Sequence, residues 1–157
     1  MSQEYYPPPA FYFGVEVLGV AAAGGQPPDV DASFQEVSGI RAELAFEEIT
    51  EGGENRFAYR LPKGTKYPNL VLKRGFVTKD SALAQWVTDT VGTKLTLPVE
   101  TKSVQVTLYA ADGQPAAAWN FANAYPLRWE LGALNSTENR VLVETFELSY
   151  TYFERVK

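Results

Sequence analysis

Apolar and aromatic side chains recur at every second position along much of this chain, in runs that end at clusters of Gly, Pro, Asn or Asp. In residues 10–19, for example, Phe11, Phe13, Val15 and Val17 share one parity. A period of two places alternate side chains on opposite faces of a pleated strand. Tyr, Phe and Trp make up 13% of the 157 residues, and these types favour strands. The chain is therefore predicted to form one mainly β domain.

The same pattern predicts further strands within residues 34–37, 40–47, 56–61, 69–76, 104–110, 117–121, 127–130 and 141–152. In the second of these, Leu44 and Phe46 belong to an apolar face that we expect to be buried. Leu70 and Leu72 are expected to point inward, and the last strand is expected to place Phe146 and Tyr152 on one face. Asp112-Gly113 is a strong hairpin signal between two of the strands.

One helix is predicted over residues 80–91. Leu83, Trp86 and Val87 recur at helical spacing, and Gly92 ends the pattern. We expect Thr78 or Asp80 to cap the first turn, and the helix to lie with Trp86 against the sheets.

Three segments are expected to lie outside the core. Residues 1–9 form an extended Pro-rich N-terminal segment, residues 20–32 form a surface loop, and residues 47–55 form a solvated hairpin tip around Gly52 and Gly53. A loop as long as 20–32 is either functional or a tolerated insertion, and its composition does not decide between the two.

The composition excludes several kinds of chemistry. The chain has no Cys and no His, which removes thiol nucleophiles, imidazole bases and the usual zinc sites. A net charge of -5 argues against binding nucleic acid by neutralising phosphates. Glycine-rich nucleotide-binding motifs are missing. Four glutamates crowd into one polar turn, namely Glu47, Glu48, Glu51 and Glu54, and they are interpreted as a solvated loop. No catalytic, cofactor-binding or metal-binding residue is predicted.

Several other features are interpreted as ordinary structure. Trp86, Trp119 and Trp129 fall on apolar periods and are predicted to be core residues. Lys73 and Arg74 are interpreted as exposed charge at a strand end. The first residues lack a basic and apolar leader, and no apolar run is long enough to span a membrane, so we expect synthesis in the cytoplasm and no membrane insertion.

Six segments occur in an order that resembles contractile phage tail tube proteins. They are FQEVSGI (34–40), EGGEN (51–55), LP (61–62), NLVLKRG (69–75), WNFANAYP (119–126) and VETFEL (143–148). The resemblance extends from about residue 11 to residue 150. It is closest to inner tube or tube-initiator proteins of extracellular contractile injection systems, and it extends to the tubes of myophages.

This resemblance implies two packed antiparallel sheets, as a β-sandwich or barrel, with one flanking helix. Subunits of this kind form hexameric rings with a continuous inner β-barrel, and the rings stack into a hollow tube inside a contractile sheath. The implied partners are other copies of the chain and the sheath, spike and baseplate proteins. Cargo protein or DNA would pass without sequence-specific binding. A structural subunit, not an enzyme, is expected, assembled into a virion or extracellular particle.

Several alternatives stay open at this point. The segments FQEVSGI, EGGENRF and NLVLKRG resemble a tube-initiating ring near the baseplate more closely than the repeated main tube protein. A hexameric tube or effector carrier of the type VI secretion kind is the competing function. An unmarked carboxylate hydrolase using Glu54 or Glu144 is a third.

Two sets of surface residues are predicted to act in assembly. Charge and a double-glycine tip favour a ring-stacking set, which comprises Glu47, Glu48, Glu51, Gly52, Gly53, Glu54, Asn55, Arg56, Lys73 and Arg74. Polar or small residues of alternating parity on two strands favour a lumen-facing set, which comprises Arg41, Glu43, Glu47, Val143, Thr145 and Glu147.

Overall fold

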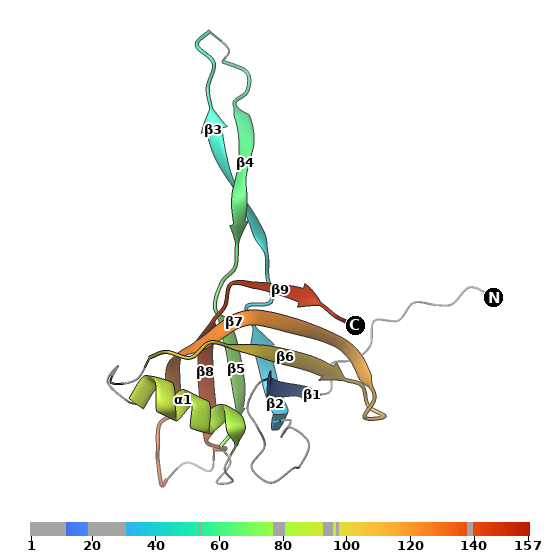
Figure 1. Cartoon of the computed structure of the whole chain (residues 1–157), viewed down its shortest axis with the longest axis vertical. Coiled ribbons are helices and arrows are strands. Elements are labelled where there is room, and N and C mark those ends of the chain that lie inside the picture. The colour runs from blue at the N-terminus through green and yellow to red at the C-terminus, as the bar shows by residue number, and fades with distance from the viewer. Residues whose placement is uncertain are drawn as a thin grey trace, which may run out of the picture.

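The computed structural model describes residues 12–18, 31–53, 55–76, 81–92, 96, 98–137 and 140–157, with the backbone alone in residues 31–33. Within these ranges the chain forms the strands and the helix seen in Figure 1. The elements are β1 (Tyr12–Leu18), β2 (Asp31–Ser38), β3 (Glu43–Ile49), β4 (Tyr59–Lys66), β5 (Leu70–Gly75), α1 (Ala82–Gly92), β6 (Lys102–Tyr109), β7 (Pro115–Leu131), β8 (Val143–Ser149) and β9 (Tyr152–Arg155). The predicted segment 1–9 and most of the loop 20–32 lie outside the described residues, and β2 already begins at Asp31.

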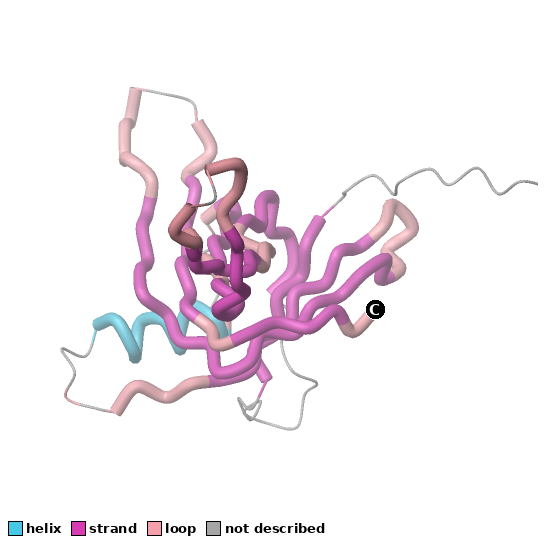
Figure 2. The backbone as a smooth tube through the Cα atoms, turned by 90° about the horizontal axis from the view of Figure 1, so that it is seen from above, coloured by secondary structure: helices cyan, strands magenta, loops and turns pink. Residues whose placement is uncertain are grey.

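Six strands close into an antiparallel barrel. The order is β6-β1-β2-β5-β8-β7, and an additional pairing of β6 with β7 joins the two ends of the sheet, while β9 pairs with β7 as a seventh strand. The curved sheet is visible in Figure 2, where the helix lies along one side. Closure satisfies backbone groups that an open sheet would leave unpaired at its edges. The prediction of a mainly β fold with one helix is confirmed, in its barrel-like form.

The barrel interior is filled by the apolar parity of each strand. Leu70 and Leu72 are fully buried, as predicted. The largest fully buried side chains of the other strands are Phe34, Phe121 and Phe146, and the rings of Phe34 and Phe146 meet edge to face with centroids 6.3 Å apart. Burial of such side chains contributes about 1.5 to 3 kcal/mol each, so this core supplies the main driving force for folding.

Helix α1 confirms the predicted helix and its buried face. Leu83, Trp86 and Val87 are buried and pack on the barrel core. The predicted cap was wrong: the hydroxyl oxygen of Ser81 accepts the N–H of Ala84 at 3.0 Å, as an N-cap residue does. Thr78 and Asp80 lie outside the described residues.

Strand β7 is one long strand where two short ones were expected. It continues through Pro126 because its partners change along its length: it pairs with β6 and β9 up to Ala124 and with β8 from Tyr125. Asn123 has a positive φ of 51° at this change, and Asn is one of the few residues that tolerate that conformation. The alternation of polar and apolar residues along one segment cannot reveal that a strand changes the strand it pairs with.

The predicted last strand is divided at Tyr150 and Thr151 into β8 and β9. Phe146, Leu148 and Tyr150 are buried as expected. The bend shifts the parity, so Phe153 packs against the core and Tyr152 is exposed, which contradicts the prediction for Tyr152.

Strands β3 and β4 form a separate two-stranded ribbon, which we call the arm (residues 43–66). It projects away from the barrel (Figure 1). The prediction that Leu44 and Phe46 lie on a buried face was wrong, because both side chains are at least half exposed. Within the described residues, no second layer covers the arm. The apolar side chains of the arm do alternate along its strands, as the sequence indicated. No described part of the same subunit covers the apolar side chains of Leu44 and Phe46.

The root of the arm is fixed by a glycine and an aromatic cluster. Gly39 has a φ of +92°, and a Cβ there would lie 2.0 Å from the carbonyl oxygen of Asn69, on the other side of the root. The hydroxyl of Tyr150 donates to the carbonyl oxygen of Gly39 at 3.2 Å. The ring of Tyr67 packs against Tyr150 and Phe153. These contacts set the direction in which the arm leaves the barrel.

Gly39→Ala should destabilise the protein by about 2 kcal/mol or more, since the new methyl group meets backbone and the φ is strained for any L residue. Urea unfolding measures this loss. Gly64→Ala is the matched control: Gly64 lies in β4 with nothing within 4 Å of an added Cβ. Its stability should change by less than about 1 kcal/mol. Equal losses in both variants would contradict this account of the root.

Candidate assembly surfaces

Most of the predicted ring-stacking residues lie on the arm. Glu47 and Glu48 belong to β3 and form exposed ion pairs across the ribbon, with Lys63 at 3.8 Å and Arg60 at 3.7 Å. Glu51, Gly52, Gly53, Asn55 and Arg56 are exposed between the two strands, and Glu54 lies outside the described residues. The ion pairs hold the two strands together, but exposed pairs contribute little stability.

Lys73 and Arg74 lie on β5 in the barrel, away from the arm tip, and they differ from each other. Lys73 points outward and pairs with Glu36 at 3.5 Å. Arg74 is only 3% exposed, so its interpretation as exposed charge was wrong. Adjacent residues on a strand point to opposite faces, and the inward parity falls on Arg74.

Arg74 takes part in a buried polar network. Its Nε donates to Glu144 Oε2 at 2.9 Å, and one of its terminal nitrogens donates to the Ser81 hydroxyl at 3.1 Å. Trp129 Nε1 donates to the other carboxylate oxygen of Glu144 at 2.8 Å. The network therefore joins β5, β8, β7 and the start of α1.

Aromatic rings complete the surroundings of this ion pair. The guanidinium lies 5.1 Å from the ring centres of both Phe34 and Phe146, within cation–π range. Glu144 was one of the two carboxylates considered for a hydrolase. Its side chain is buried and forms an ion pair with Arg74. Trp129 is half-exposed, which contradicts its prediction as a core residue, whereas Trp86 is buried and Trp119 packs partly buried against the core.

Arg74→Met should cost about 3 to 5 kcal/mol of stability, because it leaves the Glu144 carboxylate buried without its counter-charge. Lys73→Met, next to it on the outward face, should cost less than about 1 kcal/mol. A double-mutant cycle with Glu144→Leu should give a coupling energy of at least about 1 kcal/mol. Additive losses, measured by urea unfolding, would contradict a direct interaction.

The predicted lumen-facing residues fall into two groups. Val143, Thr145 and Glu147 lie on the outward face of β8, partly exposed. Arg41, Glu43 and Glu47 belong to the arm and its root, where Arg41 and Glu43 form an exposed ion pair at 3.6 Å. Within one subunit the two groups therefore lie on different parts of the fold.

The outward face of β2, β5, β8 and the second half of β7 is charged, and its cations are paired with carboxylates; we call it the charged wall. Glu147 accepts hydrogen bonds from Asn69 Nδ2 and Arg128 Nε, each at 2.9 Å. Arg128 also donates to Glu130 at 2.8 Å, and Lys73 pairs with Glu36. The pKa of Glu147 lies below its ordinary value of 4.5, mainly because the carboxylate accepts the hydrogen bond from Asn69. Desolvation raises the pKa, and the hydrogen bond and positive charge of Arg128 lower it further.

This lowered pKa implies an acid-dependent contribution to stability. The folded state favours the Glu147 carboxylate, so the contribution is present above about pH 4.5 and is lost as the pH falls through the lower folded pKa. The stability difference between the native chain and Glu147→Gln should therefore shrink from neutral pH to pH 3. Urea unfolding across this range measures it, and a constant difference would contradict it. Asn69→Ala should raise the pKa of Glu147 in an NMR titration.

Exposed apolar side chains were the main feature of the arm that the sequence prediction missed. Register places Ile49 opposite Tyr59 on one face and Phe46 opposite Pro62 on the other. Phe57 meets Tyr59 edge to face, with ring centres 5.3 Å apart. Both faces of the arm therefore expose apolar side chains, and a two-stranded ribbon is marginally stable without further packing.

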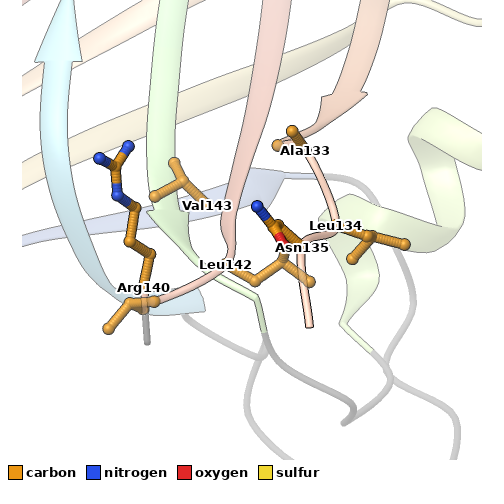
Figure 3. A pocket seen from close by; sticks show the side chains of 8 residues that line it. Ala133, Leu134, Asn135, Arg140, Leu142 and Val143 are labelled. Atoms are coloured by element: carbon orange, nitrogen blue, oxygen red, sulfur yellow. The ribbon is translucent and has the colours of Figure 1, made fainter. Parts of the chain in front are cut away.

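A pocket of about 420 Å³ lies where β7 ends and β8 begins. Figure 3 shows Leu134 and Arg140 on opposite sides of it, with Asn135 between them. The full lining is Gly132, Ala133, Leu134, Asn135, Arg140, Val141, Leu142 and Val143. Leu134 and Val141 are 77% and 74% exposed, the highest values among the large apolar residues described. Nothing in the sequence analysis pointed to this pocket.

Searches of the described residues for other kinds of site gave two results. They contain no group of three or more acidic residues placed to hold a metal ion. Among them, no helix has the length and apolar character required to cross a membrane.

The barrel, the single helix and the projecting arm can be compared with known proteins. A family model described as the T4-like virus tail tube protein gp19 matches residues 9–154. The chain belongs to this family. The match covers nearly the whole chain and confirms the resemblance inferred from the six ordered segments. None of the curated proteins compared with the chain matches it.

Solved structures agree with the family. A chain of the cryo-EM structure of the anti-feeding prophage (AFP) baseplate, six-fold symmetrised, is 25% identical, with a TM-score of 0.74 over 99% of this chain and 97% of that one. A chain of the sheath–tube complex of the extracellular contractile injection system PVC is 21% identical, with a TM-score of 0.74 over 97% and 93%. The family and its structural relatives are tail tube and injection-particle proteins.

A weaker likeness connects the fold to Hcp proteins. Hcp1 from Flavobacterium johnsoniae is 19% identical, with a TM-score of 0.56 over 93% of this chain and 95% of that one. This likeness shows a shared fold alone.

Proposed function

We propose that this tail tube protein forms hexameric rings that stack into the hollow inner tube of a contractile, phage-tail-like injection particle. The observation that carries the proposal is the family match over residues 9–154. In this role the chain is a structural subunit, not an enzyme. It is made in the cytoplasm and assembles with sheath, spike and baseplate proteins, and cargo protein or DNA passes through its lumen.

The hexameric state has two supports. The similar AFP chain comes from a baseplate with six-fold symmetry. In addition, a closed barrel that carries an uncovered ribbon with apolar side chains on both faces needs neighbours to bury that ribbon. Closed rings supply such neighbours without open-ended aggregation.

We assign the lumen to the charged wall, which includes Val143, Thr145 and Glu147. Its carboxylates and cations pair with one another, so the surface is polar without a strong field of either sign. A polyanion or a folded cargo protein can slide over such a wall without binding. Arg41, Glu43 and Glu47 extend the lining where the arm root of each subunit meets its neighbour.

We assign contact between rings to the arm, with Glu47, Glu48, Glu51, Gly52, Gly53, Glu54, Asn55 and Arg56 at or near its tip. Lys73 stays in this set as a partly exposed cation that pairs with Glu36, whereas Arg74 drops out of the set because it is buried against Glu144. Each contact between subunits can be weak, since all the copies in a ring act together.

The position of the ring along the particle is a narrower proposal. A baseplate-proximal, tube-initiating ring is supported by 25% identity to the AFP baseplate chain, against 21% to the PVC sheath–tube chain. A type VI secretion-like tube has less support, because TM-scores to the Hcp structures and to a type six secretion system protein lie between 0.53 and 0.60.

The purified chain should form six-membered rings that stack into hollow tubes, as measured by light scattering and negative-stain electron microscopy over a concentration series. Long tubes identify a main tube protein. Isolated rings that extend only after baseplate or tube proteins are added identify an initiator. A chain that stays monomeric with all of these partners would contradict the proposed function.

The same particles test the lumen assignment. Thr145→Cys should react with a small maleimide in tubes but not with a maleimide on a polymer too large to enter the pore. The unassembled subunit, in which both reagents should react, is the control. Reaction of the large reagent with intact tubes would remove β8 from the lumen.

A further inference from the structure

The end of strand β8 contacts both chain segments that connect the arm to the barrel. The segment that leads into the arm passes Gly39, whose carbonyl oxygen accepts the hydrogen bond of the Tyr150 hydroxyl at 3.2 Å. The segment that returns from the arm passes Asn69, whose Nδ2 donates to Glu147 Oε1 at 2.9 Å. Glu147 lies in β8, and Tyr150 follows the last residue of that strand. In Figure 1 the arm accordingly leaves the barrel beside the start of β9. We call these four residues the arm clamp.

The direction of the arm depends on how these two segments are held. Strands β3 and β4 pair only with each other in the part of the chain that the structure describes. The segments touch where an added Cβ on Gly39 would overlap the carbonyl oxygen of Asn69. Ile40 and Tyr67, beside the arm clamp, also pack against the core. Apolar packing is not directional, whereas hydrogen bonds are, so the two hydrogen bonds of the arm clamp fix the angle of the ribbon.

The two sides of the arm clamp differ in chemistry. The Tyr150 side uses a neutral hydroxyl that is buried, and burial, followed by the nearby Tyr67, raises its pKa above the ordinary value of 10.0. This hydroxyl therefore stays a hydrogen-bond donor wherever carboxyl groups titrate. The Glu147 side uses a carboxylate, and hydrogen bonds to an ionised group are roughly twice as strong as neutral ones. Acid therefore weakens the Asn69 contact and leaves the Gly39 contact in place.

The charged surroundings of Glu147 leave Asn69 a distinct role. Arg128 of β7 donates to the other carboxylate oxygen, Oε2, at 2.9 Å. Each oxygen of Glu147 thus has its own partner, one on β7 and one at the root of the arm. Further charged residues of the wall and the arm root pair with one another or with Arg128, and they are Glu36, Lys73, Arg41, Glu43 and Glu130.

We propose that the arm clamp is an acid-sensitive joint that ties the direction of the arm to the charged wall. Ionised Glu147 holds Asn69, and protonation of Glu147 frees that side while Tyr150 keeps holding Gly39. Glu147 is thus a positioning residue for the arm as well as part of the wall. Release follows as the pH falls below 4.5 and through the lowered pKa of Glu147. The joint belongs to a single subunit, and only its consequence for tubes, a looser arm in acid, rests on the proposed function.

Electron paramagnetic resonance measures the direction of the arm in the whole chain. The native chain has no Cys, so Asn55→Cys at the arm tip and Glu154→Cys on β9 carry one nitroxide each. The labelled chain is diluted into an excess of unlabelled chain, so that distances within one subunit are recorded. The distance distribution should be narrow at neutral pH and about twofold wider or more at about pH 3. Circular dichroism checks that the barrel stays folded.

Variants of the labelled chain identify the contact responsible. Glu147→Gln removes the charge and should give the wide distribution at neutral pH, where acid unfolding of the barrel plays no part. Asn69→Ala should do the same, and acid should then widen the distribution no further. Tyr150→Phe should widen it at neutral pH and leave the effect of acid in place. Glu130→Gln is the matched control, because this carboxylate of the same wall binds Arg128 instead of Asn69. It should keep the narrow distribution.

The outcomes separate this inference from the proposed function. Wide distributions in Glu147→Gln and Asn69→Ala, together with a narrow one in Glu130→Gln, support the joint. Equal widths in all chains, the same widening in Glu130→Gln, or a full acid effect in Asn69→Ala would overturn it. None of these results depends on whether rings form. The assembly of rings and tubes therefore tests the proposed function separately, and failure of either leaves the other standing.

Discussion

The pairing of β6 with β7 is the interaction on which the rest of this structure depends, because it closes the sheet into a barrel. Closure gives the backbone groups along the two outer strands a partner inside the subunit. It also leaves β3 and β4 without a place in the barrel wall, so they leave it as a ribbon. The subunit thus consists of a closed barrel with a buried core and a projecting arm whose apolar side chains are exposed.

The buried network around Arg74 and Glu144 connects the elements that surround the pocket end of the barrel. It joins β5 and β8 to Trp129 on β7 and to the first turn of α1. A buried ion pair of this kind adds little net stability over an apolar pair, but losing one partner is costly. Its arrangement keeps several strand ends in one geometry, which a subunit that must match its neighbours requires. The charged wall also pairs Arg with Glu, in Arg128 and Glu147, but there the pair is partly exposed to water.

Much of the fold could be predicted because it follows from short-range patterns. Alternation predicted the strands around Leu70 and Phe146, helical spacing predicted the face of α1 with Trp86, and Asp112-Gly113 predicted the hairpin between β6 and β7. The errors share one cause. Alternation says which side chains share a face, but not what covers that face: Leu44 and Phe46 are exposed on the arm, and Arg74 occupies an inward position beside Glu144.

By itself the sequence determined the β class, the single helix, the absence of thiol and imidazole chemistry and the tail tube family, since all of these depend on composition, period or ordered local segments. Only the tertiary structure decided that the sheet closes, that β7 changes partners at Asn123, that the charges of the wall pair with one another, and that a pocket lies opposite the arm. Each of these depends on contacts between residues far apart in the chain. Such contacts are set by packing and register, which no local pattern encodes.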